Sequence, residues 1–180
     1  MLILIDLDEP LADIERGFFE NWRLRFPNEP YILQENRTTF YPEDEYPQHL
    51  REKVSGIYYE PGFYLNLPPV LGSIDALNEM LRLGHDVMIC TSPLSRYEDC
   101  VLEKYLWVEK HLGKDFVKRI VMTSDKTIVR GDILIDDKPE IRGLAAPTWR
   151  HFLYDCPRNR YVTGKKRLTW ENWRGVLGLE

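Results

Sequence analysis

The sequence lacks the features of a membrane-bound, exported or disulfide-linked protein. Cys90, Cys100 and Cys156 form no C-x-x-C pair, so they predict neither a disulfide framework nor a zinc site. The apolar run at residues 2–5 is too short to span a bilayer, and the acidic residues after it interrupt any signal-peptide core. We therefore expect no transmembrane or targeting segment and a location in the reducing cytoplasm.

Positive charge is scarce as well. Lysine and arginine number 24 against 29 aspartate and glutamate, and the net charge is -5. Because a surface that binds polyanions needs clustered positive charge, we expect neither a nucleic-acid polymer nor a membrane as a partner. An anionic small molecule would have to be held by a local site. With 180 residues and 43% hydrophobic content, the chain can bury one sizeable core and predicts a single domain over 1–180.

Strand and helix patterns alternate over most of the chain. Short apolar runs predict strands at residues 2–5, 86–91, 120–122, 132–136 and 151–154. Helical periodicity lies between and after them, at residues 73–83, about 97–111 and 170–179. Such alternation is typical of β-α-β units, so the predicted fold class is α/β with an open, mostly parallel sheet.

Local residues predict where several helices begin and end. Ser73 is suited to cap the start of the helix over residues 73–83, and Gly84 is suited to follow its end. Pro10 has the fixed φ of a first helical turn, which predicts an earlier helix from about Leu11.

Residues 27–69 depart from this alternation. Prolines interrupt the segment repeatedly, and aromatic residues crowd it. We interpret it as a small cap of two or three short helices, inserted after the first strand and helix. The core would then comprise residues 1–26 and 70–180.

Polar residues follow each of the first four predicted strands. They are Asp6 and Asp8, Thr91 and Ser92, Lys126, and the pair Asp136 and Asp137. Ligands bind at the carboxyl ends of the strands in open α/β sheets, so these groups are expected to meet. Each motif alone has an ordinary reading as a polar turn or a surface residue. Their order along four strand ends favours a common site.

These residue types suit phosphate chemistry. A carboxylate that attacks a phosphate dianion faces repulsion of about 4 kcal/mol per pair of unit charges at an effective dielectric constant near 20. A divalent cation held by acids, together with a lysine and hydroxyl donors, offsets that repulsion. An aspartate nucleophile would divide the hydrolysis into two steps.

The motifs resemble those of the haloacid-dehalogenase-like (HAD) phosphatase superfamily, which are a D-x-D, a Thr or Ser, a Lys and an acidic pair in this order. A closer similarity, to the 5'(3')-deoxyribonucleotidases of the cytosolic and mitochondrial type, covers nearly the whole chain. It is carried by the stretches DLDEPLAD, GFFENWRLRFPNEPYI, ICTSPLSRYEDC, EKYLWVEKHLGKDF, VMTSDKTIVRGDILIDDKPEI and LTWENWRGVL. The resemblance implies a three-layer Rossmann-like fold with a small helical cap. It also implies Mg²⁺-dependent hydrolysis of deoxyribonucleoside monophosphates such as dUMP and dTMP through a phosphoaspartate.

The resemblance also implies residue roles. Asp6 would be the nucleophile and Asp8 the general acid and then base. Mg²⁺ would be held by Asp6, Asp8 and Asp137, with Asp136 assisting directly or indirectly. Thr91, Ser92 and Lys126 would bind phosphate. The nucleoside would lie against residues of the cap and its surroundings, namely Ile14, Phe40, Tyr41, Tyr58 and Tyr64.

The chain departs from the family pattern at four places. Vertebrate members usually have Gly-Val where this chain has Glu9-Pro10, and Ile14 replaces an aromatic residue. Tyr41 replaces a tryptophan of some relatives, and Ser95 stands where a lysine can occur. The departures leave the catalytic set intact and concern the base preference.

Other functions are compatible with parts of this pattern. A HAD phosphatase for another small phosphomonoester would use the same aspartate chemistry. A phospho-receiver signalling domain also combines acids, Thr or Ser, and Lys, but its acidic pair follows the first strand, whereas here that pair comes last. A catalytically silent relative is a further alternative, although every charged group of the motifs is present. The sequence is also compatible with a homodimer, in which the partner is a second copy of the chain.

Overall fold

A computed structural model describes residues 1–179 of the chain. Its centre is a six-stranded sheet in the order β3-β2-β1-β4-β5-β6, and every neighbouring pair is parallel. The strands are β1 (Leu2–Ile5), β2 (Asp86–Thr91), β3 (Ile120–Met122), β4 (Ile133–Asp136), β5 (Arg150–Tyr154) and β6 (Arg167–Leu168). The expected α/β class with a mostly parallel sheet is therefore confirmed. The short strand β6 was not predicted.

Strand β1 lies between β2 and β4, and the side chains of Ile3, Leu4 and Ile5 are fully buried. Ile3 and Ile5 belong to the main hydrophobic core, whereas Leu4 packs in a smaller cluster with Cys90 and Trp149. Successive side chains of a strand point to opposite faces, so the two clusters cover the two faces of the sheet. This burial on both sides explains why the run at residues 2–5 is apolar throughout.

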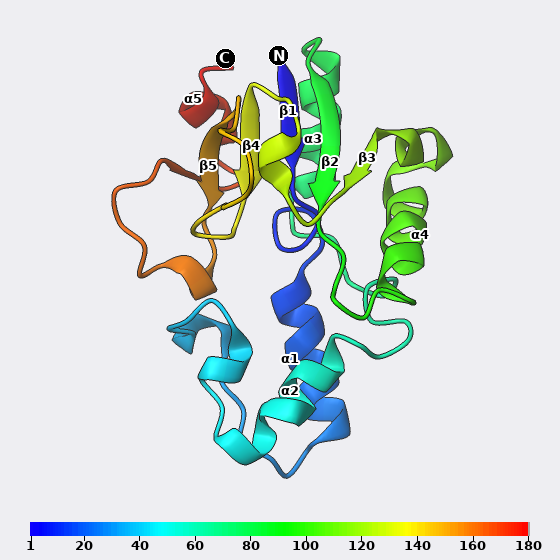
Figure 1. Cartoon of the computed structure of the whole chain (residues 1–180), viewed down its shortest axis with the longest axis vertical. Coiled ribbons are helices and arrows are strands. Elements are labelled where there is room, and N and C mark those ends of the chain that lie inside the picture. The colour runs from blue at the N-terminus through cyan, green and yellow to red at the C-terminus, as the bar shows by residue number, and fades with distance from the viewer. Residues whose placement is uncertain (180) are drawn as a thin grey trace.

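Helices α3 (Ser73–Arg82), α4 (Cys100–Leu112) and α5 (Trp173–Leu177) accompany the sheet in the upper part of the molecule (Figure 1). Helix α3 ends as predicted, with Gly84 in the left-handed conformation just beyond it. The prediction that Ser73 caps its start is wrong. Gly72 is the N-cap residue, and the Ser73 hydroxyl donates instead to the Leu11 carbonyl.

A lower part of the molecule contains α1 (Ile14–Arg25), α2 (Arg51–Ile57) and three short 3₁₀ helices. We call residues 14–67 the lower lobe. The 3₁₀ helices span Gln34–Asn36, Pro42–Asp44 and Gln48–Leu50. The carboxyl ends of β2 and β5 point toward this lobe in Figure 1. Because α1 packs against α2 and the first 3₁₀ helix, α1 lies with the lobe. The expected boundary between core and cap at residue 27 stays a prediction.

Helix α1 begins later than its proline suggested. The prediction of a helix from about Leu11 is wrong, because Asp13 is the N-cap residue and accepts the Arg16 N–H at 2.9 Å. Leu11 and Ala12 instead donate their N–H groups to the Leu7 carbonyl in a tight turn. Pro10 therefore lies in this turn, where it removes no required donor.

No helix within residues 1–179 combines the length and the apolar character that a membrane crossing requires. Three further 3₁₀ helices lie in the upper part, at Lys114–Arg119, Lys126–Ile128 and Pro157–Asn159.

Candidate active site

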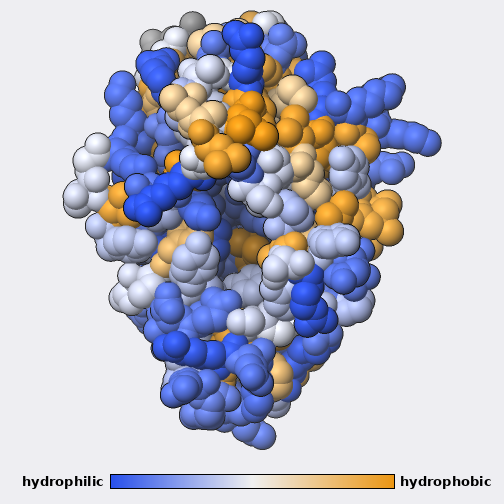
Figure 2. All heavy atoms as spheres, viewed as in Figure 1, coloured by the Kyte–Doolittle hydropathy of each residue, from blue (hydrophilic) through white to orange (hydrophobic). Residues whose placement is uncertain are grey.

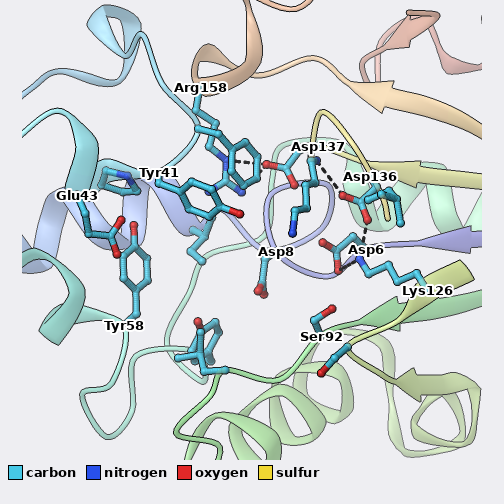
Figure 3. Close-up of a pocket in the computed structure, with 18 of the residues that line it drawn as sticks. Asp6, Asp8, Tyr41, Glu43, Tyr58, Ser92, Lys126, Asp136, Asp137 and Arg158 are labelled. Carbon is cyan, nitrogen blue, oxygen red and sulfur yellow. Dashed lines mark hydrogen bonds and ion pairs between the residues drawn. The ribbon is translucent and has the colours of Figure 1, made fainter. Parts of the chain in front are cut away.

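A cavity of about 290 Å³ opens at the carboxyl ends of the strands, and residues of the lower lobe line its other side. Figure 2 shows the surface hollowed between the two parts of the molecule. In Figure 3, Asp6, Lys126 and Ser92 lie at one end, and Tyr41, Glu43 and Tyr58 lie at the other. The catalytic, metal and substrate residues predicted from the sequence all line this cavity except Thr91. The cavity therefore has an acidic end and an aromatic end.

At the acidic end, a buried lysine joins two strand-end acids. The Lys126 ammonium lies 2.9 Å from Asp6 Oδ1 and donates to Asp136 Oδ2 at 2.6 Å. The Lys138 N–H donates to the other oxygen of Asp136 at 2.8 Å. Both oxygens of Asp136 are thus occupied by donors within the chain. Asp6 Oδ1 also accepts the N–H of Leu7 at 2.8 Å.

The second acid of the pair has a different partner. Asp137 Oδ2 accepts a hydrogen bond of 2.6 Å from Nε of Arg158 and a second contact from Nη2 of the same side chain. One carboxylate oxygen from each of Asp6, Asp136 and Asp137 lies within 4.8 Å of the other two. Such a group of hard oxygen donors fits a small divalent cation such as Mg²⁺.

Burial changes the acidity of these groups. It raises the pKa of Asp6 to about 6 against the attraction of Lys126, and it raises the pKa of Asp137 to about 7 against that of Arg158. Burial also acts to raise the pKa of Asp136, but Lys126 and the Lys138 N–H outweigh it and hold that pKa below its ordinary value. The site thus concentrates negative charge that a bound cation would neutralise.

Asp8 is held by Lys104, which was not predicted from the sequence as a site residue. Lys104 Nζ donates to Asp8 Oδ2 at 2.7 Å, to Thr91 Oγ1 at 3.1 Å and to the Ser92 carbonyl at 2.7 Å. Its side chain is 1% exposed. Thr91 is completely buried beneath this contact, whereas Ser92 reaches the cavity and donates its hydroxyl to the Thr123 carbonyl at 2.9 Å.

The five residues expected to contact a nucleoside converge on the aromatic end. Ile14, Phe40, Tyr41, Tyr58 and Tyr64 all line the cavity. The Phe40 and Tyr41 rings meet edge to face at 5.0 Å between centroids. One face of the Phe40 ring is covered by the Arg158 guanidinium, whose central carbon lies 4.4 Å from the ring centroid. This face of the Phe40 ring is therefore closed to a ligand.

Several cavity residues went unpredicted. They include Glu43, Leu94, Arg142 and Arg158. Glu43 accepts the Ser55 hydroxyl at 2.9 Å and lies beside Tyr58 in Figure 3. The sequence does contain a sign that Lys104 is buried. Lys104 lies between Cys100 and Trp107 on the face of α4 that packs inward, where a solvent-exposed lysine is not expected. No comparable pattern separates Arg158 from the other arginines of its segment.

Glu9, which departs from the family pattern, is not among the residues that line the cavity. It is 6% exposed, and its Oε2 accepts the Glu15 N–H at 3.4 Å. Burial raises its pKa well above the ordinary value, and Arg158 opposes this effect. Its φ of 83° makes it the one non-glycine residue with positive φ among residues 1–179. This conformation explains why glycine suits the position in relatives.

Comparisons with known proteins find sequence similarity over nearly the whole chain. The family model described as 5' nucleotidase, deoxy (Pyrimidine), cytosolic type C matches residues 1–179. The human 5'(3')-deoxyribonucleotidase of cytosolic type is 46% identical over 185 residues, covering 97% of this chain and 92% of that protein. The human mitochondrial 5'(3')-deoxyribonucleotidase is 40% identical, covering 97% and 81%. A Bordetella pertussis protein that provisionally bears the same enzyme name is 51% identical, covering 100% and 97%.

Solved structures show the same fold at low sequence identity. A HAD family hydrolase from Deinococcus radiodurans, solved with bound phosphate and sodium, has a TM-score of 0.62 at 14% identity and covers 98% of this chain and 94% of its own. A Thermotoga maritima protein described as a β-phosphoglucomutase has a TM-score of 0.57 at 13% identity and covers 98% of both chains. The family match over residues 1–179, together with the shared fold, shows that the chain belongs to the 5'(3')-deoxyribonucleotidase family of the HAD-like hydrolases.

Proposed function

We propose that the protein is a Mg²⁺-dependent 5'(3')-deoxyribonucleotidase that hydrolyses deoxyribonucleoside monophosphates, with dUMP and dTMP as the expected substrates. The observation that carries this proposal is that one cavity has an acid cluster with a buried lysine at one end and aromatic side chains at the other. A phosphate suits the first end, and a flat base suits the second. The names of the human and Bordetella relatives support the same substrate class.

In the proposed reaction, Asp6 attacks phosphorus and the bond from phosphorus to the nucleoside oxygen breaks. Asp8 gives its proton to that leaving oxygen, which produces the nucleoside and a phosphoaspartate on Asp6. Asp8 then takes a proton from water as the water attacks phosphorus, and inorganic phosphate leaves with Asp6 restored. Lys126, 2.9 Å from Asp6, orients the nucleophile and lies where it can attract phosphate oxygens.

Phosphate binding involves two strand-end residues in unequal positions. Ser92 reaches the cavity directly, so we assign it a contact with phosphate oxygens. Thr91 was expected to contact phosphate as well. Because it is buried and hydrogen-bonded to Lys104, the geometry supports a part for Thr91 in holding this corner of the site.

The acid cluster would hold Mg²⁺ through the carboxylates of Asp6 and Asp137 and the backbone carbonyl of Asp8. Asp136 would support the site through Lys126, since both of its oxygens already accept hydrogen bonds. When bound, the cation neutralises negative charge on the phosphate and on the attacking carboxylate.

The cavity wall also suggests a sugar preference. Ile14 and the aromatic residues give the wall of the cavity apolar side chains at its aromatic end. Burying a ribose 2'-hydroxyl without a partner costs about 1 to 3 kcal/mol, which corresponds to about tenfold to hundredfold discrimination. We therefore expect deoxyribonucleotides to be hydrolysed faster than ribonucleotides.

We also propose that the enzyme acts in the cytoplasm. The cytosolic type of the human relative supports this placement.

A substrate panel with a nucleophile variant tests the proposed function. Phosphate release would be measured with Mg²⁺ for deoxy- and ribonucleoside 5'- and 3'-monophosphates, beside 2-deoxyribose 5-phosphate and other sugar phosphates. Asp6→Asn should abolish turnover, whereas Asp115→Asn, at a fully exposed carboxylate, should not. Faster turnover of sugar phosphates than of dUMP and dTMP would refute the substrate assignment. Unchanged turnover in Asp6→Asn would refute the nucleophile.

A further inference from the structure

We infer that Arg158 is a positioning residue that couples the metal-ligand acid Asp137 to the lower-lobe segment that receives the base. The inference rests on the proposed function, because it assumes a cation at the acidic end and a base at the aromatic end. Arg158 belongs to the 3₁₀ helix Pro157–Asn159 and lines the cavity between these two ends. Figure 3 shows its guanidinium reaching toward Asp137.

On the acidic side, Arg158 fixes the orientation of Asp137. Its Nε and Nη2 both contact Oδ2 of that carboxylate, with Nε at 2.6 Å. The side chains are 8% and 2% exposed, so the pair is shielded from water. Both contacts are made to Oδ2 of Asp137. Arg158 thereby holds the carboxylate of this metal-ligand acid in one orientation.

On the lobe side, the same guanidinium begins a chain of buried contacts. Arg158 Nη1 lies 3.5 Å from Glu15 Oε1, and Glu15 Oε2 accepts a hydrogen bond of 2.6 Å from Arg37 Nη1. Arg37 Nη2 in turn donates to the Thr39 and Phe40 carbonyls at 3.3 and 3.4 Å. The contacts therefore continue from the metal-ligand acid to the backbone beside the aromatic pair.

A second contact reaches the base end directly. The Arg158 guanidinium covers one face of the Phe40 ring. A shift of Arg158 therefore acts on Phe40 in two ways, directly at its ring and, through Glu15 and Arg37, at its backbone carbonyl. The guanidinium is always charged, and it faces three buried acids, Asp137, Glu15 and Glu9. Because these charges have little solvent to screen them, a change at one acid alters the position that the others favour for Arg158.

This arrangement links cation binding and base binding through the protein. A cation drawn to Asp137 and a base placed against Tyr41 both act on the position of Arg158. If a base changes the affinity for the cation, the cation must change the affinity for the base by the same factor. A coupling of this kind needs no contact between the two ligands.

The test uses thymidine, which carries the base but no phosphate and so cannot contact a metal ion through phosphate. Mn²⁺ binding to the full-length protein would be measured by electron paramagnetic resonance, with and without saturating thymidine. In the wild type, thymidine should change the Mn²⁺ dissociation constant by about fivefold or more. Arg158→Lys, which keeps the charge but not the forked geometry, should weaken Mn²⁺ binding about tenfold and remove the thymidine effect.

Two further variants separate the two sides of the coupling. Glu15→Gln should weaken Mn²⁺ binding less than Arg158→Lys does and should reduce the thymidine effect, because it removes the charge on the lobe side and leaves both contacts between Arg158 and Asp137 in place. Arg174→Met removes an exposed arginine paired with Glu79 and should change neither quantity. Unchanged Mn²⁺ affinity in folded Arg158→Lys, or a thymidine effect that survives in it, would overturn the inference. If thymidine fails to bind any variant while sugar phosphates are hydrolysed, the proposed nucleotide substrate fails instead, and the Mn²⁺ affinities still decide the role of Arg158 at Asp137.

Discussion

At the scale of single residues, the site contains charged groups that are buried for different reasons. Asp6, Asp137 and Lys126 are buried in the candidate active site, and each has an oppositely charged partner. Glu9 is buried at a turn, in a backbone conformation that side-chain-bearing residues rarely adopt. It shares Arg158 with two other acids rather than having a cation of its own. Glu9 is therefore the residue where a substitution has the best prospect of stabilising the fold.

We predict that Glu9→Gly stabilises the protein by about 1 kcal/mol. A non-glycine residue in the left-handed region costs about 1–2 kcal/mol, and the variant also removes a buried carboxylate. The added backbone freedom of glycine in the unfolded chain offsets part of this gain. Thermal unfolding should show a melting temperature higher by about 2–4 °C.

The matched control for that variant is Glu9→Ala, which removes the carboxylate but keeps the side-chain carbon that the positive φ disfavours. It should gain less than Glu9→Gly. Equal melting temperatures for the two variants would show that backbone strain at this turn is unimportant.

Lys104 is the second residue whose role the structure adds. We predict that Lys104→Met lowers kcat for dTMP about 100-fold, because Asp8 loses the contact that fixes its carboxylate. Steady-state kinetics at saturating Mg²⁺ would measure the effect. Lys53→Met, which removes an exposed lysine paired with Glu29, serves as the control. A kcat within twofold of the wild type would show that Asp8 needs no such support.

At the scale of secondary-structure elements, α4 holds residues 62–67, the last residues of the lower lobe, by side-chain hydrogen bonds. Glu103 on this helix accepts the N–H groups of Gly62, Tyr64 and Leu65. One turn further along, Trp107 donates its indole N–H to the Leu67 carbonyl at 2.8 Å. The segment 62–67 is therefore held to α4 by side chains rather than by a sheet ladder.

We predict that Glu103→Ala lowers the free energy of unfolding by about 2 kcal/mol. Three backbone N–H groups lose a charged acceptor, and each partly buried donor left without a partner is costly. Urea denaturation would measure the loss, and the melting temperature should fall by about 4–8 °C. Glu109→Ala, at an exposed position of the same helix, should have little effect. Equal destabilisation by both variants would contradict the tethering role of Glu103.

The elements show what the sequence can and cannot predict. Apolar runs located β1 to β5 within about a residue, because burial on both faces of a parallel sheet leaves a strong local signal. The start of α1 was misplaced, since Pro10 lies in a turn and the helix begins only after Asp13, which accepts the Arg16 N–H. The two-residue strand β6 is too short to carry a pattern. Arg158 was missed because its partners are distant in sequence, and only the fold brings them together.

At the scale of the whole molecule, the arrangement of charge matters more than the net charge of -5. Acids from the ends of β1 and β4 converge, and burial raises the pKa of Asp137 to about 7 and of Asp6 to about 6. An acid with a raised pKa in the folded state binds its proton more tightly there than in the unfolded chain. Its stabilising contribution is present below the unfolded pKa and is lost as the pH rises through the folded pKa. Without a cation, the folded protein should thus lose stability between about pH 4 and pH 7.

This behaviour leads to a prediction for the metal-free protein and its Asp137→Asn variant. Asparagine cannot ionise but can still accept a hydrogen bond from Arg158, so the variant should lose less stability than the wild type as the pH rises from 5 to 8. The difference in melting temperature, variant minus wild type, should become more positive over this range in the presence of a chelator. Asp115→Asn, at a fully exposed position, should follow the wild type throughout.

Adding Mg²⁺ at pH 8 should raise the melting temperature of the wild type relative to that of Asp137→Asn, because the cation takes the place of the proton among the carboxylates. At a concentration of 100 times the dissociation constant, binding stabilises the folded state by about 2.7 kcal/mol, or a rise in melting temperature of about 5–10 °C. The wild type should show this rise, and Asp137→Asn should show a much smaller one, since it lacks one carboxylate ligand. An equal rise in both proteins would place the cation away from Asp137. A difference that stays constant from pH 5 to 8 in the chelator would mean that Asp137 does not titrate in the folded protein over this range.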